Sequence, residues 1–352
     1  MGRTPRGAKT AAGSFGLVVD SPMVIPCSEP SRRLLYDGKI EAERYWCPLV
    51  SSAPSVGLLH VQRQLDAVVA RGASFYFVGD SVSAQHMRSV ACALGVDSIA
   101  STSLGPHWLC YTRGQSRWRI CHLSGGSMTK QQSKHEVRFV EQPIVVEQGS
   151  FLDLTSSQNL AKGDIIIMNE GVHWRHHPQQ DRAYDKEMQR IARIAASTAM
   201  DRALRAGARV LWRETLSQHF NTSSGLYPRS GASREHVETC SSHDGRTAAA
   251  ALLNKTDAIN EMLTSAHPGV LILPGFASTF SLYNEHFGTC TLQNKSRPLN
   301  ASAWTAKGAK KMCDRPVGHG QHSGIDCTHW CEQSEVYHQL NAKLAKLLDV
   351  SS

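Results

Sequence analysis

The sequence lacks several features that would place it in a common class of protein. No run of about 18 apolar residues occurs, so we expect no transmembrane helix within it. There is no glycine-rich phosphate loop, which argues against a tightly bound nucleotide cofactor. There is no Cys-x-x-Cys pair of the kind found in structural zinc sites. The basic residues form no RNA-binding motif or basic helix, so nucleic acid is not an expected partner.

What the chain does contain is the composition of a globular protein. Of its 352 residues, 41% are hydrophobic and 19% are charged, which excludes a largely disordered chain. The net charge of +8 comes from scattered residues, densest at Met1–Thr10, and we interpret it as a solvated surface. Residues 1–25 have no hydrophobic periodicity, so we expect a disordered tail there and a single domain over residues 26–352.

Cysteines and glycosylation sequons indicate an oxidising compartment. The chain has ten cysteines, and we expect most of them in disulfides, Cys327 or Cys331 included. Cys27 and Cys47 frame a candidate disulfide-closed loop. Asn-x-Ser/Thr sequons begin at Asn221, Asn254, Asn294 and Asn300. These features favour the secretory pathway, although Ala11–Val19 is a poor signal sequence, so we expect a targeting or anchoring segment outside this chain.

Short buried strands alternate with helices along the chain. The expected strands are Ser74–Val78, Asp164–Met168, Ala208–Trp212 and Val270–Leu273, and the expected helices are Val61–Ala70, Val82–Leu94, Arg182–Ala206, Ala258–Thr264 and Glu332–Leu348. This order predicts an α/β protein with a mainly parallel sheet covered on both faces. Ligands bind beyond the carboxyl ends of such strands, where Ser81, Asn169 and Arg213 fall. Residues 100–160 and 216–250 are expected to be long loop insertions that form a minor lobe.

Two short motifs supply the parts of an acyl-transfer site. Ser81 follows a buried strand, and Asp326 and His329 lie three residues apart near the end of the chain. Ser81 would act as nucleophile, His329 as its base and Asp326 as the carboxylate that orients the base. Alternatively, Ser81 only caps the next helix and Asp326 caps the last one. A zinc site is a further alternative, with Cys313, Cys327, His329 and Cys331 as ligands.

Further residues are candidates for the oxyanion hole and for substrate binding. Gly79 shapes the turn before Ser81, and the amide of Asn169 could donate to an oxyanion together with the Ser81 N–H. Trp174 could stack on a sugar beside His173. Two further candidates complete the set: Gly125-Gly126 as a backbone donor, and Arg213 with His219 and Phe220 as a cluster after a strand. Each of these residues could instead serve in a turn, in the core or in an ion pair.

The motifs occur in an order that resembles a known family. They are VGDS at residues 78–81, NEGVHW at 169–174, RETLSQHF at 213–220 and DCTHWC at 326–331. This order resembles the plant trichome-birefringence-like proteins of the PC-esterase group, which share the three-layer α/β/α fold of GDSL/SGNH hydrolases. The resemblance implies polysaccharide O-acetylation in the Golgi lumen through an acetyl-serine intermediate, with Ser81, His329 and Asp326 as the triad.

The resemblance also implies the partners. The acceptor would be a polysaccharide or oligosaccharide, and the acetyl donor would be a co-substrate, either acetyl-CoA or a carrier loaded by a membrane-borne supplier. The chain departs from the family pattern at Ala84-Gln85-His86, at Val172 and at Glu332-Gln333-Ser334. Two alternatives therefore stay open: a carbohydrate acetyl-esterase with the same triad, and a glycan-binding protein without turnover.

Overall fold

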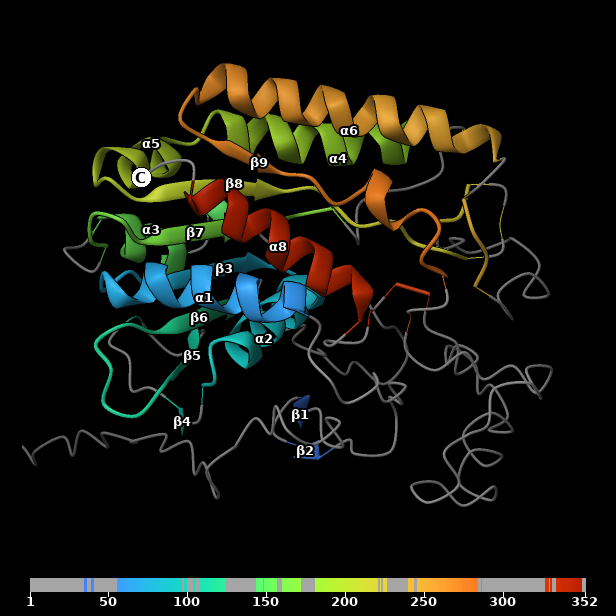
Figure 1. Ribbon diagram of the computed structural model, residues 1–352. Helices are drawn as coiled ribbons and strands as arrows, with labels where there is room; N and C mark the ends of the chain where they lie inside the picture. The colour runs from blue at the N-terminus through green and yellow to red at the C-terminus, as the bar shows by residue number, and fades with distance from the viewer. Residues whose placement is uncertain are drawn as a thin grey trace, which may run out of the picture.

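A computed structural model describes the helices and strands of the chain (Figure 1). The described residues are 35–36, 39–40, 56–96, 98–99, 104, 108–124, 144–147, 149–156, 160–171, 181–220, 222, 224–226, 240–243, 246–283, 286, 327–328, 330 and 334–349. The tail predicted over residues 1–25 and the loop between Cys27 and Cys47 lie outside them, apart from the short hairpin of β1 (Leu35–Tyr36) and β2 (Lys39–Ile40).

The centre of the molecule is a seven-stranded sheet in the order β4-β5-β6-β3-β7-β8-β9. The strands β6 (Ile120–Ser124), β3 (Phe75–Gly79), β7 (Ile165–Met168), β8 (Arg209–Arg213) and β9 (Leu271–Leu273) are parallel to one another. At one edge β5 (Trp108–Thr112) and β4 (Ser98–Ile99) pair in antiparallel fashion. The prediction of a mainly parallel sheet is therefore confirmed.

Helices cover both faces of this sheet (Figure 1). One face packs on α1 (Val56–Ala70), α2 (Ser81–Ala93) and α8 (Glu335–Asp349), which bury Phe75 and Phe77 of β3. The other face packs on α3 (Gly149–Ser156), α4 (Asp181–Ala195), α5 (Thr198–Arg205) and α6 (Thr247–Ala266), which bury Tyr76 and Val78. Side chains alternate between the two faces of a strand, so a continuous apolar run such as FYFV fills both cores.

Two sequence predictions about this architecture were wrong. The helix predicted over Arg182–Ala206 is two helices, because Ser197 leaves the helical conformation and its hydroxyl accepts a hydrogen bond from Ala199 N (3.2 Å) as the cap of α5. Residues 100–160 are not simply an insertion, because β5, β6 and α3 belong to the sheet and its cover. A disulfide between Cys110 and Cys121 joins β5 to β6.

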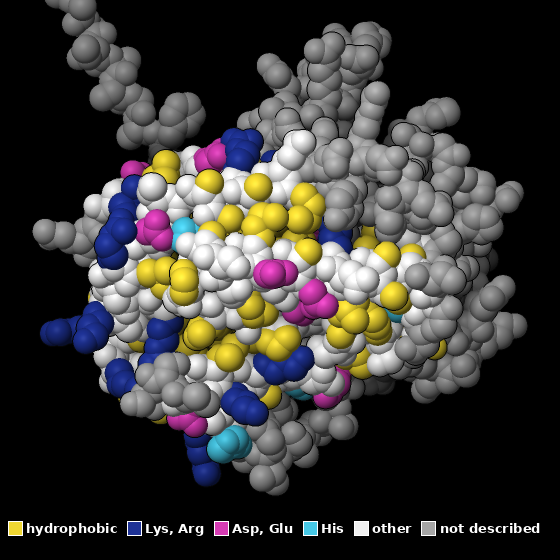
Figure 2. All heavy atoms as spheres, turned by 90° about the horizontal axis from the view of Figure 1, so that it is seen from above, with side chains coloured by type: hydrophobic (Ala, Val, Ile, Leu, Met, Phe, Trp, Pro, Cys, Tyr) yellow, Lys and Arg dark blue, Asp and Glu magenta, His cyan; other side chains and the backbone are white. Residues whose placement is uncertain are grey.

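The surface over α4 and α6 carries mixed charge. Figure 2 shows Lys and Arg side chains in separate places around this face, with acidic side chains between them. Small side chains on the outer side of α6, such as Ala250 and Ala258, are exposed together with Asp257. In this view the basic side chains of the described residues stand apart from one another. Among the described residues, none of the helices combines the length and the apolar character needed to cross a bilayer.

Candidate active site

Ser81 stands at the junction of the central strand β3 and helix α2. β3 ends at Gly79, Asp80 is the N-cap of the helix, and Ser81 is its first residue. The Asp80 Oδ1 atom accepts hydrogen bonds from Val82 N (3.0 Å) and Ser83 N (3.2 Å). The alternative in which Ser81 only caps the helix is therefore not met, because Asp80 is the N-cap. Aspartate is a common residue at this position. Partial positive charge at the start of α2 would favour a developing anion there.

Gly79 is required by the close approach of the neighbouring strand. Its φ is +152°, and a Cβ at this position would lie 2.2 Å from Asn169 O and 2.6 Å from Ser83 Oγ. The strands here end at one level, because Val78 pairs with Met168 and Met168 with Trp212. The residues that follow, Gly79, Asn169 and Arg213, therefore share one edge of the sheet, as the sequence predicted.

Asn169 joins two of these strand ends. Its amide donates to Arg213 O (2.9 Å) and to Thr215 Oγ1 (3.1 Å), and the side chain is buried. Because both amide hydrogens are used inside the protein, donation to an oxyanion would require this arrangement to change. The oxyanion role of Asn169 stays a prediction. The next residue, Glu170, is buried in an ion pair with Arg190 of α4.

Arg213 lies beneath the first turn of α2 and has no exposed surface. Its guanidinium donates to Val82 O (3.3 Å) and to Ser83 Oγ (3.2 Å). Burial lowers the pKa of Arg213, while the nearby charge of Asp80 opposes the shift. Arg213 thus brings a buried positive charge to the turn that contains Ser81. Direct contact between Arg213 and substrate stays a prediction.

The whole segment 213–220, which the sequence analysis connected with substrate, is buried. Its polar side chains bond within the protein: Glu214 accepts from Gly275 N, Phe276 N and Asn260 Nδ2, Ser217 donates to Phe276 O, and His219 bonds to Phe280 O and His286. A segment whose polar groups are satisfied in this way is an internal support. The role of His219 in substrate binding stays a prediction.

Helix α2 also holds the segment around residue 329. Gln85, one turn after Ser81, accepts a hydrogen bond at Oε1 from the backbone N–H of Trp330 (3.3 Å). The same oxygen accepts from Tyr337 Oη of α8 (3.1 Å). Residues four apart share a helix face, so Trp330 is docked on the side of α2 where Ser81 begins the helix. Gln85 belongs to a triplet that departs from the family pattern, and this contact gives it a structural role.

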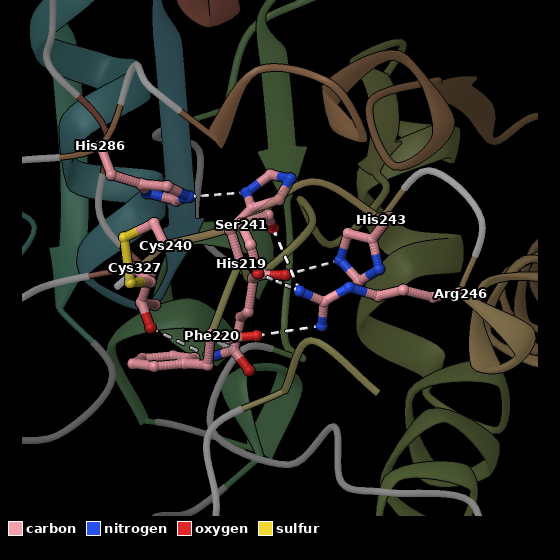
Figure 3. Close-up of a disulfide and its surroundings, with 10 residues drawn as sticks. His219, Phe220, Cys240, Ser241, His243, Arg246, His286 and Cys327 are labelled. Atoms are coloured by element: carbon pink, nitrogen blue, oxygen red, sulfur yellow. Dashed lines mark hydrogen bonds between the residues drawn. A yellow bond between two sulfur atoms is a disulfide. The ribbon is translucent and has the colours of Figure 1, made fainter. Parts of the chain in front are cut away.

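A disulfide and a hydrogen bond hold the backbone at Cys327 beside the end of segment 213–220. Cys240 and Cys327 are bonded (Figure 3), and His219 N donates to Cys327 O (3.0 Å). Gln218 Nε2 donates to Thr328 Oγ1 (3.2 Å). The expectation that Cys327 or Cys331 is paired is confirmed for Cys327. That pairing also removes Cys327 from the zinc alternative, and no group of metal-binding side chains occurs within the described part of the chain.

A buried histidine on β6, His122, was not identified from the sequence. The backbone of Gly79 and Asp80 hydrogen-bonds to its ring, and burial lowers its pKa to about 4, with nearby Arg88 adding to the shift. The ring is therefore neutral near pH 7 and supports the turn before Ser81. The strand that carries His122 was itself not predicted, so no sequence signal pointed to this residue.

The predicted triad is only partly placed. The backbone of Ser81 is described, whereas Asp326, His329, His173, Trp174 and Gly125-Gly126 lie outside the described residues. The structure brings the Ser81 turn, Asn169, Arg213 and both described neighbours of residue 329 to one region. His286 and Gln85 also belong to this region. Neither was predicted, because their contacts cross 67 and 245 residues.

The fold and this junction define a three-layer α/β protein with a serine at the turn between its central strand and the next helix. A family model described as PC-Esterase, the GDSL/SGNH-like acyl-esterase family found in Pmr5 and Cas1p, matches residues 65–332. The chain belongs to this family, and its fold is the SGNH-like one. None of the curated proteins matches the chain. The match makes acyl-esterase or acyltransferase chemistry the activity class of the protein.

Proposed function

We propose that the protein is a polysaccharide O-acetyltransferase. Ser81 Oγ attacks the carbonyl carbon of an acetyl donor while His329 takes the hydroxyl proton, and the donor leaves with that proton. A sugar hydroxyl then attacks the acetyl-serine, gives its proton to His329 and departs as the acetyl ester, while Ser81 recovers a proton. Asp326 holds the tautomer of His329 and stabilises its charged form.

The observation that carries the proposal is the hydrogen bond between Trp330 N and Gln85 Oε1. It supports a common site because it brings the residue after His329 to the helix that Ser81 begins. The contact of Thr328 with Gln218 and the Cys240–Cys327 disulfide add to this support on the other side of residue 329. This hydrogen bond joins residues 245 positions apart in the sequence, and it supports a common site for the two motifs that carry the predicted triad.

A carbohydrate acetyl-esterase is the second candidate, and the description of the family as acyl-esterases favours it. Transferase and esterase share the acetyl-serine and differ in whether a sugar or water removes the acetyl group. We propose transfer because the order of motifs resembles the trichome-birefringence-like branch of the family.

The proposal includes a lumenal compartment and two partners. The disulfides support a place in the secretory pathway, for which we propose the Golgi lumen. The sequon asparagine Asn254 is exposed on α6, where a glycan has room. The acceptor is a poly- or oligosaccharide, and acetyl-CoA or a membrane-borne carrier supplies acetyl as a co-substrate.

Intact-mass analysis tests this function directly. Wild type and Ser81→Ala are exposed briefly to p-nitrophenyl acetate, and each is then mixed with acceptor oligosaccharide of the xylan or pectin type or with buffer. We expect one acetyl adduct on wild type and none on Ser81→Ala, with faster loss of the adduct when oligosaccharide is present.

Each other outcome has a defined meaning. Equal loss in buffer and oligosaccharide would assign the esterase. An adduct on Ser81→Ala would exclude Ser81 as the nucleophile. Absence of both adduct and released acetate would contradict catalysis and leave the glycan-binding alternative.

A further inference from the structure

Trp330 is held between two histidine rings. The indole is fully buried and stacks on His286, with ring centroids 3.7 Å apart and an interplanar angle of 29°. The His219 ring lies nearly perpendicular to the indole, with ring centroids 5.3 Å apart and an interplanar angle of 88°. The backbones of His286 and Trp330 also form an isolated antiparallel bridge. His286 thus contacts Trp330 through both its side chain and its backbone.

Hydrogen bonds set the orientation of both histidine rings. His219 Nε2 lies 3.0 Å from Phe280 O, and a carbonyl only accepts, so this nitrogen carries the proton. His219 Nδ1 is then the acceptor for His286 Nε2–H at 2.7 Å (Figure 3). Burial, with nearby His286 and His243, lowers the pKa of His219 to about 2, which keeps its ring neutral. The His286 ring is therefore held in one plane against Trp330.

The histidine pair rests on a rigid support. Arg246, half-buried beside it, donates to Phe220 O (3.0 Å) and Ser242 O (2.7 Å), and so joins the backbone after His219 to the backbone after Cys240 (Figure 3). His243 Nε2 donates to Gln218 O at 2.6 Å. The backbone around His219 is thus held by hydrogen bonds and a disulfide, and the bond from His219 to His286 transmits this restraint to the His286 ring.

We propose that His286 is a positioning residue for the acyl-transfer site, and that it acts through its stack on Trp330 to orient the segment containing His329. This rests on the proposed function of His329 as the base. Covalent geometry links residue 329 to Thr328 and Trp330, so the place of both neighbours limits where its ring can reach. A displacement of about 1 Å in a catalytic group can cost about a hundredfold in rate. His286 itself is only 3% exposed, which removes it from contact with substrate.

Three variants separate positioning from a general effect on folding. His286→Ala removes the stacked ring, and His286→Phe keeps an aromatic ring without the N–H donor. His267→Ala is the matched control, because His267 is equally buried and bonds to Asp201 (2.7 Å) at the end of α6 that leads into β9, away from the carboxyl edge of the sheet. Acetyl release from p-nitrophenyl acetate is measured per folded molecule.

We expect His286→Ala to lower kcat at least about tenfold with KM changed less than about twofold. His286→Phe should stay within about threefold of wild type, and His267→Ala should match wild type. The proposal is overturned if His286→Ala loses no more than His267→Ala, if only KM changes, or if His286→Phe is as slow as His286→Ala.

A spectroscopic measurement separates this proposal from the proposed function. The seven tryptophans are labelled with fluorotryptophan, and the signal of Trp330 is assigned as the one missing in Trp330→Phe. We expect this fluorine signal to shift in His286→Ala and to keep its place in His267→Ala. An unmoved signal in His286→Ala overturns the stack, whatever the activity. Full activity in Ser81→Ala, by contrast, would refute the proposed function and leave the fluorine result standing.

Discussion

Gln85 and Trp330 are 245 residues apart in the sequence and are joined by a hydrogen bond of 3.3 Å from the Trp330 backbone to Gln85 Oε1. The bond is buried and shares its acceptor with Tyr337 of α8. It links the two motifs on which the proposed reaction depends, and the last helix holds the same acceptor in place.

Gln85→Leu removes this acceptor and leaves the buried N–H of Trp330 without it. An unsatisfied buried donor costs about 1–3 kcal/mol, so we expect the free energy of unfolding to fall by about 2 kcal/mol, together with the rate of acetyl release. Urea unfolding and ester hydrolysis measure the two effects. Gln64→Leu is the control, because Gln64 bonds to Asp349 on the exposed surface. Equal stability losses in both variants would contradict the role of Gln85.

Gly79→Ala tests the contact between β3 and Asn169. The added Cβ would meet Asn169 O at 2.2 Å, and the φ of +152° is unfavourable for alanine. Gly72→Ala shares the positive φ (+88°) but has no atom within 4 Å of its Cβ. Because overpacking adds about 1–3 kcal/mol, we expect Gly79→Ala to be less stable than Gly72→Ala by about 2 kcal/mol in urea unfolding. Equal stability of the two would show that the strand ends tolerate the methyl group.

The buried charge of Arg213 is expected to interact with Asp80. Arg213→Met removes the cation, and Asp80→Asn keeps the helix cap but removes the carboxylate charge. We expect Arg213→Met to lower the free energy of unfolding by about 3 kcal/mol. In the double variant the losses should fall short of additivity by about 1 kcal/mol. Arg193→Met, at an exposed ion pair with Glu147, should cost less than about 1 kcal/mol. Additive losses would mean that the two charges are independent.

Three buried histidines predict a loss of stability in acid. Burial lowers the pKa of His86 well below its usual range, that of His122 to about 4 and that of His219 to about 2. Unfolded, each histidine binds a proton near pH 6.5, so between that pH and the folded pKa the unfolded state holds more protons. Stability is therefore complete above about pH 6.5 and falls as the pH drops below it, by up to about 1.4 kcal/mol per pH unit for each histidine.

Urea unfolding at about pH 7 and about pH 5 measures this slope. Replacing His122 by Gln should reduce the dependence of the free energy of unfolding on pH by the contribution of one histidine. A profile that is flat over this range, or a slope that the substitution leaves unchanged, would contradict the neutral state of these rings.

The two disulfides are expected to differ in their effect on activity. Cys240 and Cys327 close a span of 87 residues, and Cys110 and Cys121 close a span of 11. On the chain-entropy model, replacing each pair by alanine costs about 4–5 and about 3 kcal/mol, respectively. Because only the first pair holds the segment next to Thr328, only its loss should slow acetyl release per folded molecule. Ester hydrolysis at matched folded fraction checks this, and equal rates in both variants would speak against the link.

The sequence was informative where the signal was local. Apolar runs such as 75–78 and 165–168 mark the parallel strands, and the glycine or polar residue after each run marks where the strand ends. The strands β5 and β6 were missed because each has only five residues, and polar residues such as His122 and Ser124 interrupt the apolar run of β6. The break at Ser197 was missed because the residues on both sides favour a helix.

The sequence by itself determined the α/β class, the position of Ser81 after the central strand and the motif order that indicates the family. Only the tertiary structure decided that segment 213–220 is an internal support, that Asp80 caps α2, and that Gln85 and His286 hold Trp330. The physical reason is the separation along the sequence of the residues that interact. Strands and caps follow from neighbouring residues, whereas a buried hydrogen bond or ring stack depends on which distant segments the sheet brings together.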